Sequence, residues 1–365
     1  MINLTRLLFP AAGLGAPQGR EGTLGAGLKV IWDARSAMDF YEVRGVIDDL
    51  AELGTQVLMF TECDPEEEGL GVLDAAEYAA AKGIRVTLRF QGKLVSSELA
   101  SMLREIGVAF VSEQLEGPEP IHDYITGVDG SYAALIQSIR NCKAVGLKFN
   151  LVFTLNRRTL QYLPHAFQVV EEENVDRLVV AHRVYTQKGD AHLDPSPEQM
   201  RQAMDYLIDR AIHYRMQGRA FELFTVDNCC DAIYAYLKTR GENRDRAARI
   251  FQQMTRSGGN RSGVSLVAID RSGYILADPH TPQYTFGNIF EQPFREIWTQ
   301  ARHPVLQGLR NREVFIKGRC QGCRWLPICG GNSRTRAEAV TGDFWESDPQ
   351  CYLTDAEIST GAVVE

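Results

Sequence analysis

The sequence lacks several features that mark large classes of proteins. In its 365 residues, no apolar run reaches the roughly 20 residues that a membrane-spanning helix needs. It also lacks an excess of basic residues, since 39 lysines and arginines stand against 47 aspartates and glutamates, for a net charge of −8. A nucleic-acid partner is usually bound through a basic surface. We therefore expect neither a membrane nor a nucleic acid among the partners.

The N-terminus lacks the pattern of a secretion signal. Its opening segment, MINLTRLLFPAAGLGAP, carries one arginine and an apolar patch that Pro10 interrupts. That patch is shorter than the roughly 7–15 apolar residues of a signal peptide. We therefore expect a cytoplasmic protein. Disulfides are rare in that compartment, so clustered cysteines there indicate metal or redox chemistry.

Cysteine is absent from the whole segment before Cys63. The chain has eight cysteines, and the last four lie close together near its C-terminal end. These are Cys320, Cys323, Cys329 and Cys351, with the spacing C-x2-C-x5-C-x21-C. Four thiolates at such a spacing hold either one zinc ion or one iron–sulfur cluster, and the spacing alone does not choose between them.

Strand and helix patterns alternate through the middle of the chain. Buried-strand patterns cover 28–33, 56–62, 84–90, 108–116, 147–155 and 177–185. Amphipathic helix patterns follow them over 40–54, 72–83, 96–107, 131–146, 159–175 and 196–217. Such alternation predicts a parallel sheet covered by helices. Eight units would close a full barrel, so six predict a partial (βα)6 barrel with its active face at the strand C-terminal ends.

The alternation stops near residue 221. Helices are expected over 244–259 and 293–311, with a β-hairpin between them that turns at 271–273. We expect a poorly ordered lead-in over 1–27, the barrel over 28–220, the cysteine module with its linking helices over 221–355, and a loose tail over 356–365.

The cysteine module also resembles a known family. The stretch GRCQGCRWLPICGGNSRTRAEAVTGDFWESDPQCYLTDAEI is similar to the C-terminal SPASM region of radical SAM proteins. The similarity extends through GVSLVAIDRSGYILADPH, FGNIFEQPFREIW, FTLNRRTLQYLPHAFQVVEEENVDR and GPEPIHDYITGVDGSY, and so covers most of the chain. Within this family the chain is most similar to the enzymes of heme d1 biosynthesis and the alternative heme pathway, which modify tetrapyrrole side chains.

The resemblance implies a radical SAM barrel and one auxiliary [4Fe-4S] cluster. The implied cluster ligands are Cys320, Cys323, Cys329 and Cys351. Some relatives bind a second auxiliary cluster through cysteines around the hairpin, but residues 264–287 contain none. One cluster is therefore expected.

The family's other cluster motif is missing. Radical SAM enzymes carry CxxxCxxC after the first strand, and the iron left open there chelates S-adenosylmethionine (SAM). The three cysteine positions fall on Met38, Glu42 and Gly45. The glycine-rich GGEP segment is replaced by TECDPEEE at 61–68, and the FRG segment by Ile125–Thr126–Gly127. The resemblance therefore implies a degenerate member that does not bind SAM.

Several other side chains are candidates for a site. Cys63, with Glu42, Glu62 and Asp64, would be a poor substitute cradle, because iron–sulfur clusters prefer thiolates. The alternative is an acidic solvated loop beside a half-buried thiol. Cys142 is expected in the core. The remaining candidates are the adjacent Cys229 and Cys230, the histidines His182 and His280, and Arg334 and Arg336, which would balance cluster charge or bind a carboxylate.

Three hypotheses of function follow. The leading one is a degenerate radical SAM/SPASM protein that keeps one [4Fe-4S] cluster and acts as an accessory, electron-relay or carrier protein, beside an active radical SAM paralogue. A rival is an active enzyme that modifies a tetrapyrrole or a peptide through unconventional cluster ligands. The third is a zinc-stabilised binding module.

Overall fold

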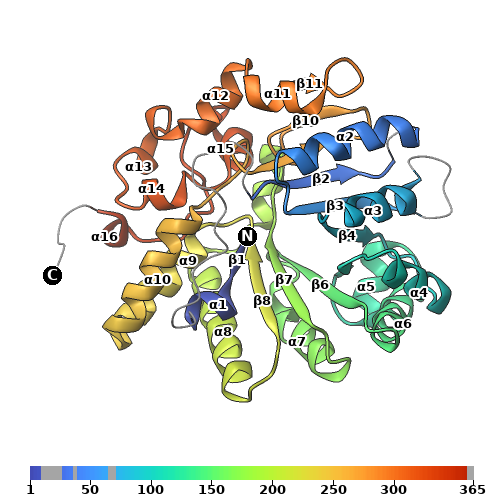
Figure 1. The fold of residues 1–365 in the computed structure, drawn as a ribbon. Helices are drawn as coiled ribbons and strands as arrows, with labels where there is room; N and C mark the ends of the chain where they lie inside the picture. The colour runs from blue at the N-terminus through green and yellow to red at the C-terminus, as the bar shows by residue number, and fades with distance from the viewer. Residues whose placement is uncertain (10–26, 36–38, 65–70, 360–365) are drawn as a thin grey trace.

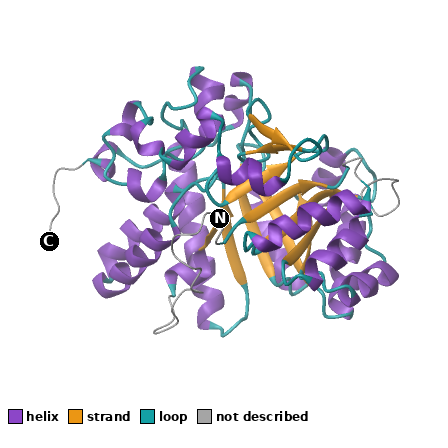
Figure 2. Cartoon of the chain, turned by 45° about the horizontal axis from the view of Figure 1, so that its top comes forward, coloured by secondary structure: helices purple, strands orange, loops and turns teal. Residues whose placement is uncertain are grey.

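A computed structural model gives the fold and describes residues 1–9, 27–35, 39–64 and 71–359. Its centre is an eleven-stranded sheet in the order β1-β8-β7-β6-β5-β4-β3-β2-β9-β10-β11 (Figure 1). The strands lie inside a shell of helices (Figure 2). The predicted partial barrel with a C-terminal module is confirmed.

The six predicted parallel strands are all present. They are β2 (Lys29–Asp33), β3 (Val57–Cys63), β4 (Arg85–Phe90), β5 (Phe110–Leu115), β6 (Lys148–Leu155) and β7 (Arg177–His182). Two further strands extend the parallel part of the sheet: β8 (Glu222–Val226), which was not predicted, pairs with β7, and β9 (Leu266–Ile269), predicted only as part of the hairpin, pairs with β2. Both lie beyond residue 220, so barrel and module share one sheet. The division of domains at that residue stays a prediction.

Burial alternates along the first strands. Val30 and Trp32 in β2, and Leu58 and Phe60 in β3, are fully buried, while the residues between them are only partly buried. Side chains of a strand point alternately to its two faces, so one face packs under the helices and the other lines the barrel. The covering helices are α2 (Phe40–Glu52), α3 (Val72–Ala81), α4 (Ser97–Glu105), α5 (Glu119–Thr126), α6 (Ser131–Ala144), α7 (Leu163–Glu172) and α8 (Pro197–Met216).

The N-terminal segment is more ordered than the expected lead-in. Residues Ile2–Asn3 form β1, which pairs antiparallel with β8, and Leu4–Leu8 form helix α1. Leu4, Leu7 and Leu8 are buried in the main core. These contacts attach the segment to the last parallel strand. The rest of the expected lead-in, 10–26, lies outside the described residues.

The C-terminal half wraps around one side of the barrel, where the helices of the module gather beside α9 and α10 (Figure 1). The hairpin is confirmed as β9 and β10, and β11 adds to it. The elements are α9 (Cys230–Glu242), α10 (Arg244–Ser257), β10 (Tyr274–Leu276), β11 (Thr285–Asn288), α11 (Phe294–Gln300), α12 (Pro304–Arg310), α13 (Gly318–Gln321), α14 (Leu326–Cys329), α15 (Arg334–Thr341) and α16 (Asp355–Ile358).

Two expectations about this half were wrong. The single helix over 293–311 is two helices, because Ala301 takes a left-handed φ of 45° and Pro304 begins the next helix. The expected tail from 356 is held as far as α16, where Glu357 pairs with Arg201 at 2.9 Å. Residues 360–365 lie outside the described part.

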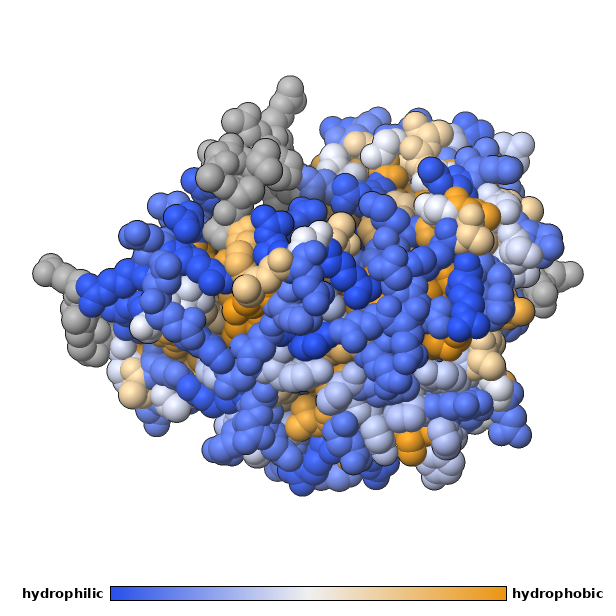
Figure 3. Space-filling model, turned by 90° about the horizontal axis from the view of Figure 1, so that it is seen from below, coloured by the Kyte–Doolittle hydropathy of each residue, from blue (hydrophilic) through white to orange (hydrophobic). Residues whose placement is uncertain are grey.

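The surface seen from below is mostly hydrophilic, with small scattered apolar patches (Figure 3). Within the described residues, no helix combines the length and apolar character that crossing a membrane would require.

Candidate metal centre

The four module cysteines lie on short helices and the loops that join them. Cys320 is in α13, Cys323 follows it, Cys329 ends α14, and Cys351 precedes α16. Gly330 and Gly331, directly after Cys329, have φ of 69° and 80°, a left-handed conformation that glycine adopts without strain. A Cβ atom at Gly331 would lie 2.6 Å from the Ile316 side chain. The glycine pair therefore lets the chain turn sharply behind Cys329.

Two cysteines far from these four in the sequence join this group. Cys230, at the start of α9, has its Sγ 3.5 Å from the Sγ of Cys351. Both Cys229 and Cys230 also hydrogen-bond with Cys329. Burial raises the pKa of Cys320 and of Cys323, and the nearby charges of Cys329 and Cys351 raise both further. Six of the eight cysteines thus form one neighbourhood, which the sequence spacing of the module did not reveal.

Hydrogen bonds give these thiols different acidities. Those from Cys229 and Cys230 hold the pKa of Cys329 well below its usual value. The hydrogen bond from Cys230 similarly lowers the pKa of Cys351, and nearby Arg319 adds to this effect. Burial instead raises the pKa of Cys323 to about 11. Cys329 and Cys351 therefore favour the thiolate, the form in which cysteine binds metal, whereas the pKa values of Cys229 and Cys230 are raised.

The surroundings suit negatively charged sulfur. The backbone N–H of Trp325 donates to the Sγ of Cys323 at 3.4 Å, and Arg319 Nη1 donates to the Sγ of Cys351 at 3.3 Å. Arg312 is buried beside the group, and burial lowers its pKa to about 10. A set of cysteine sulfurs with N–H donors and cations fits a four-iron cluster. Among the described residues, no three His, Cys, Asp or Glu side chains are arranged around a single ion.

Asparagines fix the two extra cysteines to the module. The side-chain oxygen of Asn332 accepts from the backbone N–H of Cys229 at 2.7 Å, and its nitrogen donates to Asn228 at 2.8 Å. Asn228 in turn donates to the carbonyl of Gln350 at 3.1 Å. The end of β8 and the module are therefore joined through buried polar contacts. The adjacency of Cys229 and Cys230 was the sequence signal for this arrangement.

His182, a candidate site residue, contacts the residue that follows Cys230. It ends β7, is buried, and its Nε2 is 2.8 Å from Asp231 Oδ2. The other oxygen of Asp231 accepts from the hydroxyl of Tyr352 at 2.7 Å. Because Asp231 follows Cys230 and Tyr352 follows Cys351, this chain of contacts holds both cysteines in place. His280, the other candidate, lies half-buried in the turn after β10.

Arg334 and Arg336 do not lie on the surface. Both are buried, with exposed fractions of 2% and 0%. Arg334 donates to the carbonyls of Phe344 and Gly331, among others. Arg336 forms a fully buried ion pair with Asp348, with an N–O distance of 2.7 Å. Apart from the buried Nε of Arg334, which has no hydrogen-bond partner, their N–H groups bind other parts of the protein rather than an exposed carboxylate ligand.

The region that would carry the SAM cluster has a different structure. Asp39 caps α2, with its side chain accepting from Glu42 N at 2.9 Å while the Glu42 carboxylate accepts from Asp39 N at 3.2 Å. Glu42 and Gly45 therefore stand in the first turns of a helix. Met38, the remaining lost position, lies outside the described residues.

The side chains considered as substitute cluster ligands around Cys63 have other hydrogen-bond or ion-pair partners. Cys63 ends β3 with 2% of its surface exposed, and its thiol donates to the carbonyl of Phe60 at 3.3 Å. Burial raises its pKa to about 12, which keeps it a thiol. Glu62 bonds to Gln91, and Asp64 pairs with Lys93. Residues 65–70, including the acidic run 66–68, lie outside the described part. Cys142 is buried in α6, as expected for a core residue.

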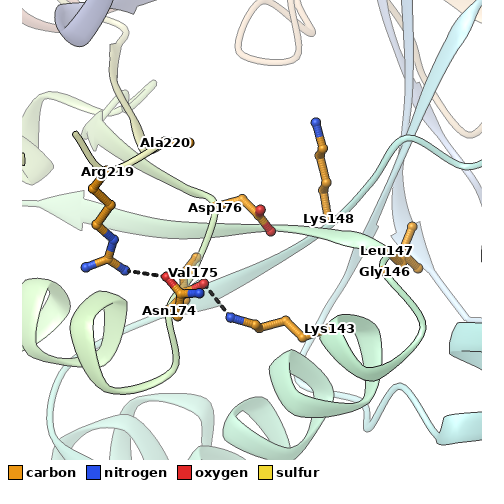
Figure 4. A pocket seen from close by; sticks show the side chains of 9 residues that line it. All are labelled: Lys143, Gly146, Leu147, Lys148, Asn174, Val175, Asp176, Arg219 and Ala220. Atoms are coloured by element: carbon orange, nitrogen blue, oxygen red, sulfur yellow. Dashed lines mark hydrogen bonds between the residues drawn. The ribbon is translucent and has the colours of Figure 1, made fainter. Parts of the chain in front are cut away.

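Two other polar features have structural explanations. Asp123 caps the next helix by accepting from the backbone N–H groups of Gly130 and Tyr132, each at 2.8 Å. A hollow of about 430 Å³ lies at the opposite end of the barrel from the C-terminal ends of the parallel strands (Figure 4). Lys143 and Arg219, which line the hollow, both donate hydrogen bonds to Asn174, just after the C-terminal end of α7.

Comparison with known proteins places the chain. No family model matches it. Fe-coproporphyrin III synthase of Methanosarcina barkeri is 38% identical over 322 residues, which are 87% of this chain and 80% of that protein. Pre-heme d1 synthase of Dinoroseobacter shibae is 32% identical over 334 residues, 89% and 81% of the two chains. Streptococcus suis SuiB has a similar fold, with a TM-score of 0.68 at 15% identity over 90% of this chain and 77% of its own. The chain therefore belongs to the radical SAM/SPASM family, among its heme-pathway members.

Proposed function

We propose that this chain is a tetrapyrrole-pathway protein that holds one [4Fe-4S] cluster, does not cleave SAM, and acts as an accessory, electron-relay or carrier protein. One contrast carries the proposal: cysteine sulfurs gather in the C-terminal module, whereas Glu42 and Gly45, two of the three positions of the missing motif, lie in helix α2. Cys320, Cys323, Cys329 and Cys351 would hold the cluster. When bound, it would supply one-electron transfer.

The proposed loss of SAM chemistry follows from coordination. A cluster that four cysteines hold has no open iron to chelate the amine and carboxylate of SAM. Cys63, the first cysteine after the lost motif in the sequence, is buried, and burial raises its pKa to about 12. This chain would therefore carry the electron-transfer site, and an active paralogue would supply the SAM-binding site.

A tetrapyrrole is the favoured ligand class. Two relatives are named for Fe-coproporphyrin III and pre-heme d1. Such macrocycles carry carboxylates, which guanidinium groups bind as planar forks. Arg157 and Arg158 are exposed just after β6, on the C-terminal side of the barrel. We assign them, rather than the buried Arg334 and Arg336, as carboxylate-binding candidates.

Iron analysis and a SAM assay test the proposal together. The protein, purified without oxygen, is expected to contain about four irons and four sulfides per chain. Incubation with dithionite and excess SAM is expected to release no 5′-deoxyadenosine above background. Replacing Cys323 with Ala should abolish the cluster absorbance, while the core variant Cys142→Ala should keep it.

Other results would select a rival function. SAM cleavage that persists in Cys323→Ala would identify an enzyme with unconventional ligands. Stoichiometric zinc in protein from iron-replete cells would identify a zinc-stabilised module. Titration with an iron tetrapyrrole is expected to show micromolar binding that Arg157→Ala/Arg158→Ala weakens. An anaerobic pull-down with the active paralogue tests the partner. If both binding experiments fail, the tetrapyrrole assignment is wrong and a peptide ligand becomes the next candidate.

A further inference from the structure

We propose that Cys230 shares one corner of the cluster with Cys351: its S–H group donates to the bound Cys351 thiolate, and its sulfur replaces Cys351 as ligand when that thiol is removed. This inference rests on the proposed cluster in the module. It adds to that site a residue that lies 121 positions earlier in the sequence than Cys351.

The sulfurs of Cys230 and Cys351 are too close together to bind two different irons of one cluster. Their separation is 3.5 Å, which is a hydrogen-bonding contact between thiols. The cysteines of a four-iron cluster each bind a different iron, and their sulfurs stand apart on separate corners of the cube. Two sulfurs in contact cannot bind irons on separate corners, so Cys351 binds while Cys230, which also contacts Cys329, donates a hydrogen bond to it.

Cys230 is held in this position from several sides. It has 1% of its surface exposed, and its backbone N–H donates to Asn228 at 3.1 Å. The Asn332 side chain donates to its sulfur at 3.9 Å. The next residue, Asp231, is fully buried and accepts from Tyr352, the residue after Cys351. The same contacts thus fix both sulfurs, and their proximity is built into the junction between α9 and the module.

Each state of the shared corner has a defined chemistry. With Cys351 bound, the Cys230 S–H stabilises negative charge on the coordinating sulfur, and this favours the reduced cluster. With Cys351 absent, the Cys230 thiol gives up its proton to solvent and one new Fe–S bond forms at the vacant corner. No electron is transferred in that exchange.

Iron retention tests the replacement. We compare wild type, Cys351→Ala, Cys230→Ala/Cys351→Ala and Cys323→Ala after anaerobic reconstitution with iron and sulfide. Cys351→Ala is expected to keep most of the wild-type iron and absorbance, and the double variant is expected to lose them. Cys323 is the matched control: in the described structure its Sγ accepts from the Trp325 N–H and has no thiol at hydrogen-bonding distance, so its loss should not be compensated. Equal iron loss in Cys351→Ala and the double variant would overturn the inference.

A redox titration decides the case even if Cys351→Ala fails to fold, because it leaves all four proposed ligands in place. Cys230→Ala removes the donor, and we expect a more negative midpoint potential at unchanged iron content. Cys230→Ser keeps an O–H donor and should return the potential toward that of wild type. Equal potentials for wild type and Cys230→Ala would overturn the shared corner. A wild-type protein without iron would instead refute the proposed function itself.

Discussion

The buried pair of Arg336 and Asp348 should be among the most sensitive points of the fold. Both side chains are 0% exposed, and their charged groups are 2.7 Å apart. The carboxylate accepts four N–H groups: two from Arg336, at 3.1 and 2.7 Å, and the backbone N–H groups of Ser333 and Gln350, at 2.9 and 3.0 Å. Arg336 also donates to the carbonyls of Arg183 and Asp227, after β7 and β8. The pair therefore joins the module to the barrel.

The change Asp348→Asn keeps the shape of the side chain and removes its charge. One oxygen becomes an NH2 group that faces N–H donors, and the Arg336 guanidinium is left charged and buried. Removing one partner of a buried ion pair costs about 3–5 kcal/mol. We expect a decrease of that size in the free energy of unfolding, measured by anaerobic urea denaturation with tryptophan fluorescence.

The matched control is Asp343→Asn in the same module. Asp343 pairs with Lys317 at 2.6 Å, but the two side chains are 38% and 57% exposed. Water screens exposed pairs, so this variant should unfold close to wild type. If the two variants unfold at the same urea concentration, the buried pair does not join the module to the barrel in the way argued above.

Two further predictions concern single positions. Glu113 in β5 is 1% exposed, and burial raises its pKa well above the ordinary carboxyl value. The folded state then holds this proton longer than the unfolded state, so wild-type stability falls as pH rises from about 4.3 to the raised pKa. Glu113→Gln removes this loss and should raise the melting temperature at pH 7 but not at pH 4; equal gains at both pH values would contradict this reasoning. A Cβ at Gly259 would lie 1.9 Å from the carbonyl oxygen of Cys329, so Gly259→Ala should lower both iron content and melting temperature. Gly45→Ala, with nothing within 4 Å of its Cβ in α2, should stabilise by about 1 kcal/mol, and similar melting temperatures for the two glycine variants would refute the clash.

Local pattern was enough to predict much of this molecule from its sequence. The six strand–helix units follow from the spacing of apolar residues, because a strand or helix buries the face that its own period defines. The hairpin followed from its alternating pattern and turn. The family followed from the cysteine spacing and the segments around it, and the lost motif followed from the identities of Met38, Glu42 and Gly45.

Only the tertiary structure decided which distant residues meet. Cys230 touches Cys351 because β8 ends beside the module, yet β8 itself was not predicted, since five residues carry a weak pattern and gain their strand pairing from β7. From the sequence, Arg334 and Arg336 were candidates to balance cluster charge or to bind a carboxylate. Their burial depends on Asp348 and on carbonyls of the module and the barrel, which no local period encodes. Sequence spacing therefore determined the four module cysteines, whereas the packing of barrel against module decided that two more thiols and a buried ion pair surround them.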